Sequence, residues 1–213
     1  MKDTVRFGII GAGNMGYGHL GFFNDGKIKR GSVAAIADPN ADKRARALNI
    51  CPPGTAAYES GGELIKRAKD DGVDAVIVAV PHYDHPGLSI AALNAGLHTI
   101  CEKPAGVYTK QVLEMNVAAS KAKALFTLMY NQRTNPLYQK MRELVRDGAT
   151  GALKRVNWLI TNWYRTQFYY DSSSWRATWA GEGGGGRFEG AGRGVPAKPL
   201  SARERPRKGA VRG

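Results

Sequence analysis

The chain has 213 residues, of which 43% are hydrophobic and 23% are charged, and its formal net charge is +13. This composition is typical of a globular protein, and no apolar run reaches the roughly 20 residues that a membrane-spanning helix needs, so no membrane partner is expected. Cys51 and Cys101 lie far apart and form no metal-spacing motif, which predicts buried thiols in a reducing cytoplasm and no metal site.

Strands and helices are predicted to alternate through the first 130 residues. Strands are expected at 5–10, 32–38, 74–80, 97–104 and 125–131. Helices are expected from the glycine-rich turn to about residue 24, at 41–48, 62–69 and 86–96, and from residue 112. The segment 74–80 shows no polar alternation, as expected for a parallel strand covered on both faces. This order indicates an α/β fold with a doubly wound parallel sheet of the Rossmann type.

The pattern changes after about residue 131. A helix is expected to start at Pro136 and to end at Gly148, with Leu137, Met141, Leu144 and Val145 on one face. Residues 152–165 alternate and are rich in aromatic side chains, which predicts a long strand of a different sheet. We therefore expect a boundary near 124–135, a Rossmann domain at 1–123 and an incomplete α+β second domain at 124–186.

A glycine-rich motif follows the first expected strand. Gly11, Gly13 and Gly16 match the pattern G-x-G-x-x-G, with Asn14 and Met15 between the last two glycines, and Asp38 follows 22 residues after Gly16. A tight turn without a ligand is the structural alternative. The preceding strand, the following helix and the acid favour a dinucleotide site, because the helix N-terminus offers free N–H groups to a pyrophosphate.

Asp38 ends the second expected strand, where an adenosine ribose would lie in such a site. A carboxylate there accepts hydrogen bonds from the ribose hydroxyls and repels a 2′-phosphate, so it favours NAD, with NADP as the alternative cofactor. Asn40, Lys43 and Arg44 are close enough in sequence to weaken that preference. The competing interpretation is a solvent-facing aspartate that caps the next helix.

The segment "CEKPAG" places Glu102 and Lys103 at the carboxyl end of a parallel strand. Ligands of open α/β sheets bind at this edge, so the Lys103 ammonium is a candidate to orient a carbonyl or hydroxyl near a nicotinamide. The alternative is a Glu–Lys pair in a surface turn without a functional role.

Four segments together carry a family resemblance: "GAGNMG", the acid after the second strand, "AVPHYDHPGLSIAALNAGLHTICEKPAG" and "YNQRTNP". They resemble the Gfo/Idh/MocA oxidoreductases, named for glucose–fructose oxidoreductase, inositol dehydrogenase and MocA. Over roughly residues 3–186 the resemblance implies a Rossmann domain followed by a domain with an open, mostly antiparallel sheet. It also implies hydride transfer between NAD(P) and a hydroxyl of a sugar, inositol or related polyol, and homo-oligomers in intact relatives.

The resemblance also implies roles for individual residues. Lys103 would be the catalytic or substrate-orienting residue, and Gln132 and Arg133 would lie at the cleft between the domains. The nicotinamide side of the cofactor would be lined by Pro81, His82, His85, Glu102 and Lys103. His82 and His85 at a strand end are equally consistent with caps or satisfied surface groups.

Aromatic and arginine side chains gather near the end of the expected second domain. Such side chains stack on sugars and hydrogen-bond to them, so they are candidates for substrate contacts. Core packing or a subunit interface of the second sheet explains them equally well. The candidates are Trp163, Tyr164, Arg165, Trp175 and Arg176.

Residues 187–213 differ from the rest of the chain. They contain eight Lys or Arg and two Glu, so they hold +6 of the net charge, and they are dominated by Gly, Arg, Pro and Ala. This composition predicts a disordered tail. The leading hypothesis is a frameshifted or truncated reading of a longer gene after about Gly186. A basic arm that binds nucleic acid is the less favoured alternative, because Phe188 is its only aromatic residue.

The sequence thus favours an NAD(P)-dependent oxidoreductase whose catalysis is impaired in this chain. In the resembling family a second-domain histidine accepts the substrate proton, whereas all four histidines here lie within the first 98 residues. A dinucleotide-binding module without catalysis is the alternative function.

Overall fold

The computed structural model describes residues 3–157, 159, 161, 164–172, 175, 176 and 178–182. The chain divides into two compact units, Met1–Met129 and Tyr130–Gly213. The predicted basic tail and Trp163 lie outside the described residues. Among the helices that are described, none has both the length and the apolar character needed to cross a membrane.

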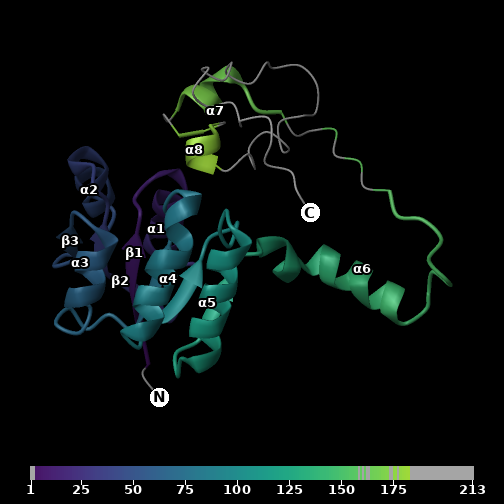
Figure 1. The fold of residues 1–213 in the computed structure, drawn as a ribbon, viewed down its shortest axis with the longest axis horizontal. Helices are drawn as coiled ribbons and strands as arrows, with labels where there is room; N and C mark the ends of the chain where they lie inside the picture. The colour runs from purple at the N-terminus through teal and green to yellow at the C-terminus, as the bar shows by residue number, and fades with distance from the viewer. Residues whose placement is uncertain are drawn as a thin grey trace. The chain divides into compact units, whose positions relative to one another are not determined.

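The first unit is built on a six-stranded sheet in which every neighbouring pair is parallel (Figure 1). The strand order is β3-β2-β1-β4-β5-β6. The strands β2 and β3 therefore lie on one side of β1, and β4, β5 and β6 lie on its other side. This arrangement confirms the predicted doubly wound Rossmann-type fold. The strands are β1 Val5–Ile10, β2 Gly31–Ala37, β3 Ala56–Tyr58, β4 Ala75–Val78, β5 His98–Cys101 and β6 Phe126–Leu128.

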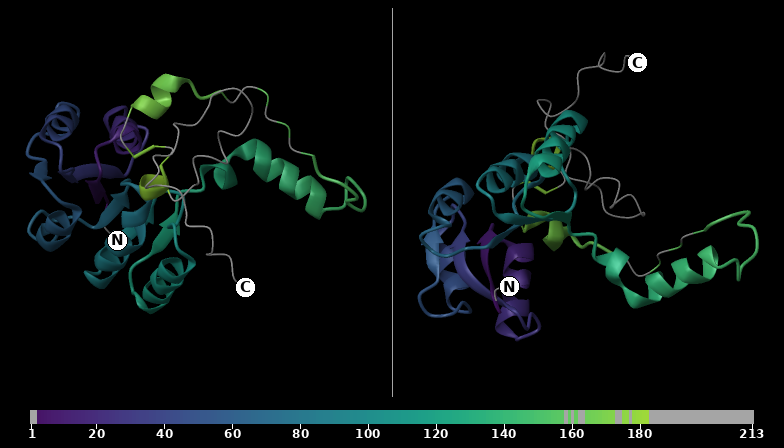
Figure 2. Two further views of the ribbon diagram at one scale, coloured as in Figure 1. Left: turned by 45° about the horizontal axis from the view of Figure 1, so that its top comes forward. Right: turned by 90° about the horizontal axis from the view of Figure 1, so that it is seen from below.

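Helices cover both faces of this sheet, and Figure 2 (right) shows the sheet between α1 in purple and α4 and α5 in teal. Successive side chains of a strand point to opposite faces, so Ile9 packs with Leu20 of α1, whereas Ile10 packs in the cluster that contains Leu64 of α3. The helices of this unit are α1 Asn14–Asn24, α2 Ala41–Leu48, α3 Gly61–Arg67, α4 His85–Asn94 and α5 Thr109–Lys121, with the short 3₁₀ turn η1 His82–Asp84.

Two details of the sheet differ from the sequence analysis. The three-residue strand β3 was not predicted, because it is too short to show an alternating pattern, and it is formed by parallel pairing with β2. The expected strand at 125–131 is shorter in the structure, where only 126–128 pair with β5. The sheet of the first unit therefore extends past residue 123.

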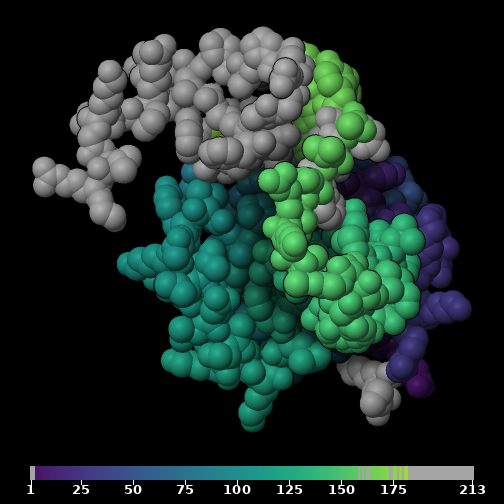
Figure 3. Space-filling view, turned by 90° about the vertical axis from the view of Figure 1, so that its right-hand side faces the viewer, coloured from purple at the N-terminus to yellow at the C-terminus, as the bar shows by residue number. Residues whose placement is uncertain are grey.

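Among the described residues of the second unit, α6 Pro136–Arg146 is the longest helix. The side chain of Asn135 accepts a hydrogen bond from the backbone N–H of Leu137, and Gly148 follows the helix with φ +75°, as the predicted start and stop require. Leu137 and Met141 are 77% and 50% exposed. Figure 3 shows the surface of this helix in green. The other elements are η2 Asn131–Thr134, α7 Gln167–Asp171 and α8 Trp179–Glu182.

The strand predicted over 152–165 is not formed at its described residues. Positions 152–157, 159, 161, 164 and 165 have no regular secondary structure, and the remaining positions lie outside the described residues. A strand needs a neighbour that accepts and donates its backbone hydrogen bonds, and the described part of the second unit contains no strand. The expected antiparallel sheet of the second domain stays a prediction.

Candidate cofactor site

The chain makes a tight turn at Gly11, directly after β1. Gly11 has φ +95°, and a Cβ atom on it would lie 2.4 Å from the carbonyl oxygen of Ala79. Its backbone N–H donates a hydrogen bond of 2.7 Å to the carbonyl of Ala37. The turn therefore lies between the end of β2 and the residue after β4, and only glycine fits there.

Gly13 and Gly16 are glycines for different physical reasons. A Cβ on Gly16 would lie 1.7 Å from the carbonyl oxygen of Gly11, so this glycine allows α1 to approach the turn. A Cβ on Gly13 would meet no atom within 4 Å, and its φ of −67° is accessible to any residue. The protein itself therefore does not require glycine at position 13, and the open space lies at the start of α1.

The N-terminus of α1 is suited to hold an anion in that space. Gly13 is the N-cap residue, and it has no side chain that could accept a hydrogen bond from the first turn of the helix. Asn14 and Met15, the first two helical residues, are exposed. The uncapped N–H groups and the helix dipole fit the pyrophosphate of a dinucleotide, and the space that a Cβ of Gly13 would fill allows its close approach.

Asp38 holds the glycine turn in place. Its carboxyl group is buried, and one oxygen accepts a 2.9 Å hydrogen bond from the N–H of Ala12 while the other accepts one of 2.9 Å from the N–H of Asn40. The helix α2 is instead capped by the side chain of Asn40, which accepts from Lys43 N–H. The alternative of a solvent-facing, helix-capping Asp38 is therefore wrong. Each carboxyl oxygen keeps a second lone pair for a ribose hydroxyl.

The cations near Asp38 are partly committed to other groups. The guanidinium of Arg44 donates to the carbonyl oxygens of Asp38 and Pro39, at 2.8 and 3.1 Å. The guanidinium of Arg46 lies 3.7 Å from the centre of the Tyr17 ring. Arg44 is thus directed at main-chain carbonyls, and its Nη2 atom also lies 3.4 Å from Oε1 of Glu59, which limits its capacity to neutralise a further anion.

Glu102 follows β5 and is buried, with 4% of its surface exposed. Its Oε1 atom lies 2.8 Å from Nε2 of His19 on α1, and its Oε2 atom accepts a 3.2 Å hydrogen bond from the N–H of Lys103. Burial alone would raise the pKa of the Glu102 carboxyl. The hydrogen bond and attraction of His19, together with the amide and charge of Lys103, outweigh burial, so the pKa of Glu102 is lowered.

This lowered pKa predicts a pH-dependent contribution to stability. A carboxyl with a lower pKa in the folded state than in the unfolded state stabilises the fold above its ordinary titration range, and that stabilisation is lost as the pH falls through the lowered pKa. We expect the free energy of unfolding of the wild-type chain to fall more steeply than that of Glu102→Gln below about pH 5. Urea titrations at a series of pH values measure this, and parallel pH profiles would contradict it.

The loops after β4 and β5 are joined by His85, which is 1% exposed. Its ring nitrogens lie 2.6 Å from the carbonyl oxygen of Pro104 and 2.9 Å from that of Val80. His85 therefore supports the loop that carries Lys103, whose own side chain is exposed. The predicted contacts of His85 with a cofactor stay a prediction.

The predicted cofactor residues of the first unit all follow the carboxyl ends of strands. Because the strands are parallel, their carboxyl ends share one edge of the sheet, and this is the edge where open α/β sheets bind ligands. Residues from four strands are brought together there: Gly11, Gly13, Asn14, Met15 and Gly16 after β1, Asp38 after β2, Pro81, His82 and His85 after β4, and Glu102 and Lys103 after β5.

The remaining predicted site residues belong to the second unit. Gln132 and Arg133 lie on η2 and are exposed, and Tyr164 is 69% exposed. The guanidinium groups of Arg165 and Arg176 lie 4.6 and 4.2 Å from the centre of the Tyr169 ring. Arg176 also donates a hydrogen bond to the Tyr169 hydroxyl and lies 4.9 Å from the ring centre of Trp175.

Comparison with known proteins identifies the family. Residues 5–130, which span the glycine turn, Asp38, Glu102 and Lys103, match the Gfo/Idh/MocA family model, described as an oxidoreductase family with an NAD-binding Rossmann fold. The chain belongs to the Gfo/Idh/MocA oxidoreductase family. NAD is the cofactor of this Rossmann fold, and the site geometry fits it.

Two curated members of the family are similar to the chain over most of its length. It is 31% identical to inositol 2-dehydrogenase of Corynebacterium glutamicum over 167 residues, which cover 76% of this chain and 47% of that protein. It is also 31% identical to the rhizopine catabolism protein MocA of Rhizobium meliloti over 183 residues, or 86% of this chain and 52% of MocA. The chain thus spans about half the length of these curated relatives.

Solved structures that are similar to the chain include a WlbA dehydrogenase and a scyllo-inositol dehydrogenase, both with bound ligands. The WlbA dehydrogenase of Chromobacterium violaceum, in complex with NADH and UDP-GlcNAcA, is 25% identical with a TM-score of 0.72, covering 85% of this chain and 51% of WlbA. The scyllo-inositol dehydrogenase of Lactobacillus casei, with bound NAD(H) and scyllo-inositol, is 25% identical with a TM-score of 0.64, covering 70% and 42%.

No motif in the sequence singles out His19 or Tyr169, although Tyr169 lies in the aromatic-rich segment near the end of the expected second domain. His19 follows Gly16 by three residues, so the helical repeat places both on the buried face of α1. That spacing is the one signal in the sequence for a buried His19, but nothing local indicates its partner 83 residues away. Tyr169 carries no comparable signal.

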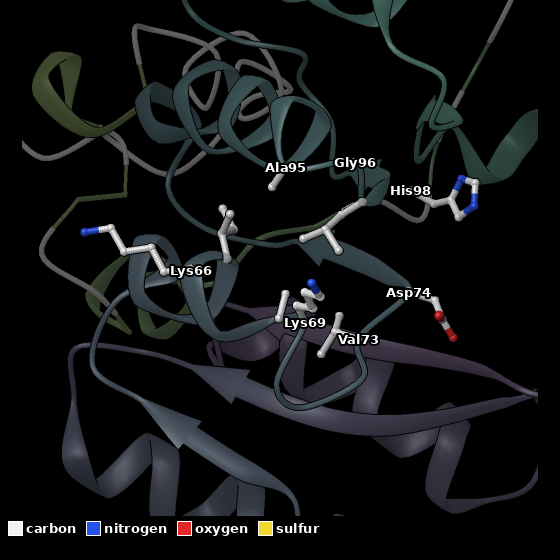
Figure 4. Close-up of a pocket in the computed structure, with 10 residues that line it drawn as sticks. Lys66, Lys69, Val73, Asp74, Ala95, Gly96 and His98 are labelled. Atoms are coloured by element: carbon white, nitrogen blue, oxygen red, sulfur yellow. The ribbon is translucent and has the colours of Figure 1, made fainter.

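A cleft also opens at the opposite edge of the sheet, around the start of β4 and β5 (Figure 4). It has a volume of about 570 Å³. Lys66, Lys69, Asp74 and His98 lie along it, together with apolar residues of α3 and of the segment after α4. The side chains of Lys66 and His98 lie at opposite ends and do not converge on one point, so the cleft offers no defined ligand geometry.

Proposed function

We propose that the chain binds NAD at the carboxyl edge of its sheet and serves hydride transfer between NAD and a hydroxyl of an inositol, a related polyol or a sugar. The observation that carries the proposal is the open space at Gly13, above the uncapped N–H groups of α1. Nothing in the packing of the protein requires glycine there, whereas a bound pyrophosphate does.

Each predicted residue has a distinct role in this proposal. The first turn of α1 binds the phosphates, and the free lone pairs of Asp38 accept hydrogen bonds from the adenosine ribose. The exposed ammonium of Lys103 orients the substrate hydroxyl by donating a hydrogen bond to its oxygen. When bound, NAD supplies the hydride acceptor, and the residues of the chain bind and orient the reactants around it.

The names of the relatives support the substrate class. Inositol 2-dehydrogenases and a scyllo-inositol dehydrogenase are among the proteins that the chain resembles. We propose further that the arginine and aromatic residues of the second unit form the substrate side. The members of that set are Arg133, Tyr164, Arg165, Trp175 and Arg176, with Trp163 outside the described residues, whereas Gln132 stays a predicted cofactor contact. The free thiols of Cys51 and Cys101 support a cytoplasmic location, and homo-oligomerisation stays a prediction.

The site is expected to prefer NADH over NADPH. The carboxyl group of Asp38 lies where a 2′-phosphate would be placed, and Arg44 is directed at the carbonyls of Asp38 and Pro39. We expect NADH to bind about tenfold more tightly or better, since about 1.4 kcal/mol of repulsion gives that ratio. Calorimetric titration of both cofactors measures it, and equal or tighter NADPH binding would refute the ribose role of Asp38.

The reaction is tested by the appearance of NADH absorbance when NAD is mixed with the protein and myo-inositol, scyllo-inositol or glucose. We expect slow formation of NADH with at least one inositol, because catalysis is predicted to be impaired in this chain, and we expect Lys103→Met to remove this activity while NADH still binds. Saturable NADH binding without turnover on any polyol would instead assign a dinucleotide-binding module. Absence of NADH binding would overturn the proposal as a whole.

A further inference from the structure

His19 and Glu102 form a buried pair between two parts of the site. His19 lies on the inner face of α1, five residues after the helix starts, and Glu102 lies at the carboxyl end of β5. Nε2 of His19 is 2.8 Å from Oε1 of Glu102, and both residues are less than one-tenth exposed. The pair therefore connects the phosphate-binding helix with the loop that carries Lys103.

The second oxygen of Glu102 continues this connection. It accepts a 3.2 Å hydrogen bond from the backbone N–H of Lys103, and the backbone N–H of Glu102 donates to the carbonyl of Val78 at 2.9 Å. The Lys103 side chain is exposed, so its own packing does not determine its position. The Lys103 backbone is held instead by the carboxylate of Glu102, together with the contact between His85 and the next residue, Pro104.

Because the Glu102 carboxylate is charged and buried, loss of its hydrogen bond from His19 would destabilise the arrangement around it. Because the pKa of Glu102 is lowered, its carboxyl is ionised at neutral pH and only accepts hydrogen bonds, so Nε2 of His19 is the donor. A buried carboxylate that loses such a donor is left with an unmet hydrogen bond and a poorly compensated charge. The Lys103 loop would then rearrange to bring water or another donor to the carboxylate.

We propose that His19 is a positioning residue for the nicotinamide side of the site. Through its hydrogen bond to Glu102, it fixes the position of the Lys103 backbone relative to α1. The proposal rests on the proposed function, since it assumes that the nicotinamide lies beside the Lys103 loop. It concerns neither the phosphates nor the ribose of the adenosine, which are held by α1 and Asp38.

The test compares NADH with ADP-ribose, which has the same adenosine, phosphates and ribose but no nicotinamide. We expect His19→Leu to weaken NADH binding about tenfold and ADP-ribose binding less than about twofold. His19→Gln places an amide N–H where Nε2 of His19 lies, so we expect it to restore NADH affinity to within about threefold of wild type. Isothermal titration calorimetry measures all of these affinities.

The controls separate this proposal from the proposed function. Wild-type protein that binds neither ligand refutes the proposed function, and an equal loss of both ligands in His19→Leu refutes only the positioning role. A His19→Gln variant as weak as His19→Leu also overturns it, because the donor would then not matter.

A second variant keeps the test valid if His19→Leu does not fold, which circular dichroism would show. Glu102→Gln retains the side-chain shape but removes the carboxylate, and the same selective loss of NADH affinity is expected. In a folded His19→Leu/Glu102→Gln double variant the losses should be less than additive, because the unpaired carboxylate is gone. Additive losses would show that the two residues act independently and would overturn the proposal.

Discussion

Replacing Gly13 with valine should abolish NADH binding while leaving the fold intact. A side chain at this position meets no protein atom within 4 Å, and its φ of −67° strains no residue, so packing is preserved. The branched side chain would occupy the space through which a pyrophosphate reaches the N–H groups of α1. We expect the NADH affinity to fall at least about 100-fold, since the pyrophosphate would lose two or more charge-assisted hydrogen bonds to these N–H groups and each costs about 1.5–3 kcal/mol.

Calorimetric titration measures the NADH affinity of this variant, and thermal unfolding of the same preparation measures its stability. The melting temperature should fall by only a few degrees, because an N-cap change costs about 1 kcal/mol. Gly18→Ala is the control, since a Cβ there also meets nothing within 4 Å but lies a full turn further along α1. A Gly13→Val protein that binds NADH normally would place the cofactor elsewhere.

Replacing Gly16 with alanine should destabilise the protein strongly. The added Cβ would lie 1.7 Å from the carbonyl oxygen of Gly11, which is main chain and can move only if the turn or α1 moves. Overpacking a well-packed core costs about 1–3 kcal/mol, and we expect at least the upper end of this range here because the added atom meets main chain. The melting temperature should then fall by about 10 °C.

Gly18→Ala is a matched control for this variant, because it makes the same change two residues along the same helix. A Cβ at Gly18 has no neighbour within 4 Å, and alanine stabilises a helix interior by about 0.5–1 kcal/mol relative to glycine. Thermal and urea unfolding of both variants should therefore move in opposite directions. Equal stability of the two variants would contradict the prediction, because it would show that α1 can move away from Gly11 without lowering the free energy of unfolding.

Elements with a strong local pattern could be predicted from the sequence. The boundaries of α2 at 41–48 and β1 at 5–10 agree with the structure, because a polar N-cap or a continuous apolar run marks them. The strand β3 has no such pattern and exists through its pairing with β2. The region 152–165 shows the opposite case, in which alternating residues do not form a strand where they are described, because the described part has no partner strand.

The same distinction holds for the cofactor site. The glycine spacing and the acid at position 38 are local signals, and they predict a dinucleotide site at this edge of the sheet. The buried contacts of Asp38 with Ala12 and of Glu102 with His19 join residues 26 and 83 positions apart. These contacts form because the strand order brings distant loops to one edge of the sheet. No spacing between neighbouring residues in the sequence predicts them.

The two hydrogen bonds that Asp38 accepts have a consequence for redesigning the protein toward NADP. Exchanging this acid for a small neutral residue is the direct way to admit a 2′-phosphate. Here that exchange would also leave the N–H groups of Ala12 and Asn40 without their acceptor and loosen the turn that both cofactors need. A successful redesign must therefore keep an acceptor for Ala12 while it adds a cation for the phosphate, which makes cofactor exchange in this protein a problem of at least two coupled substitutions.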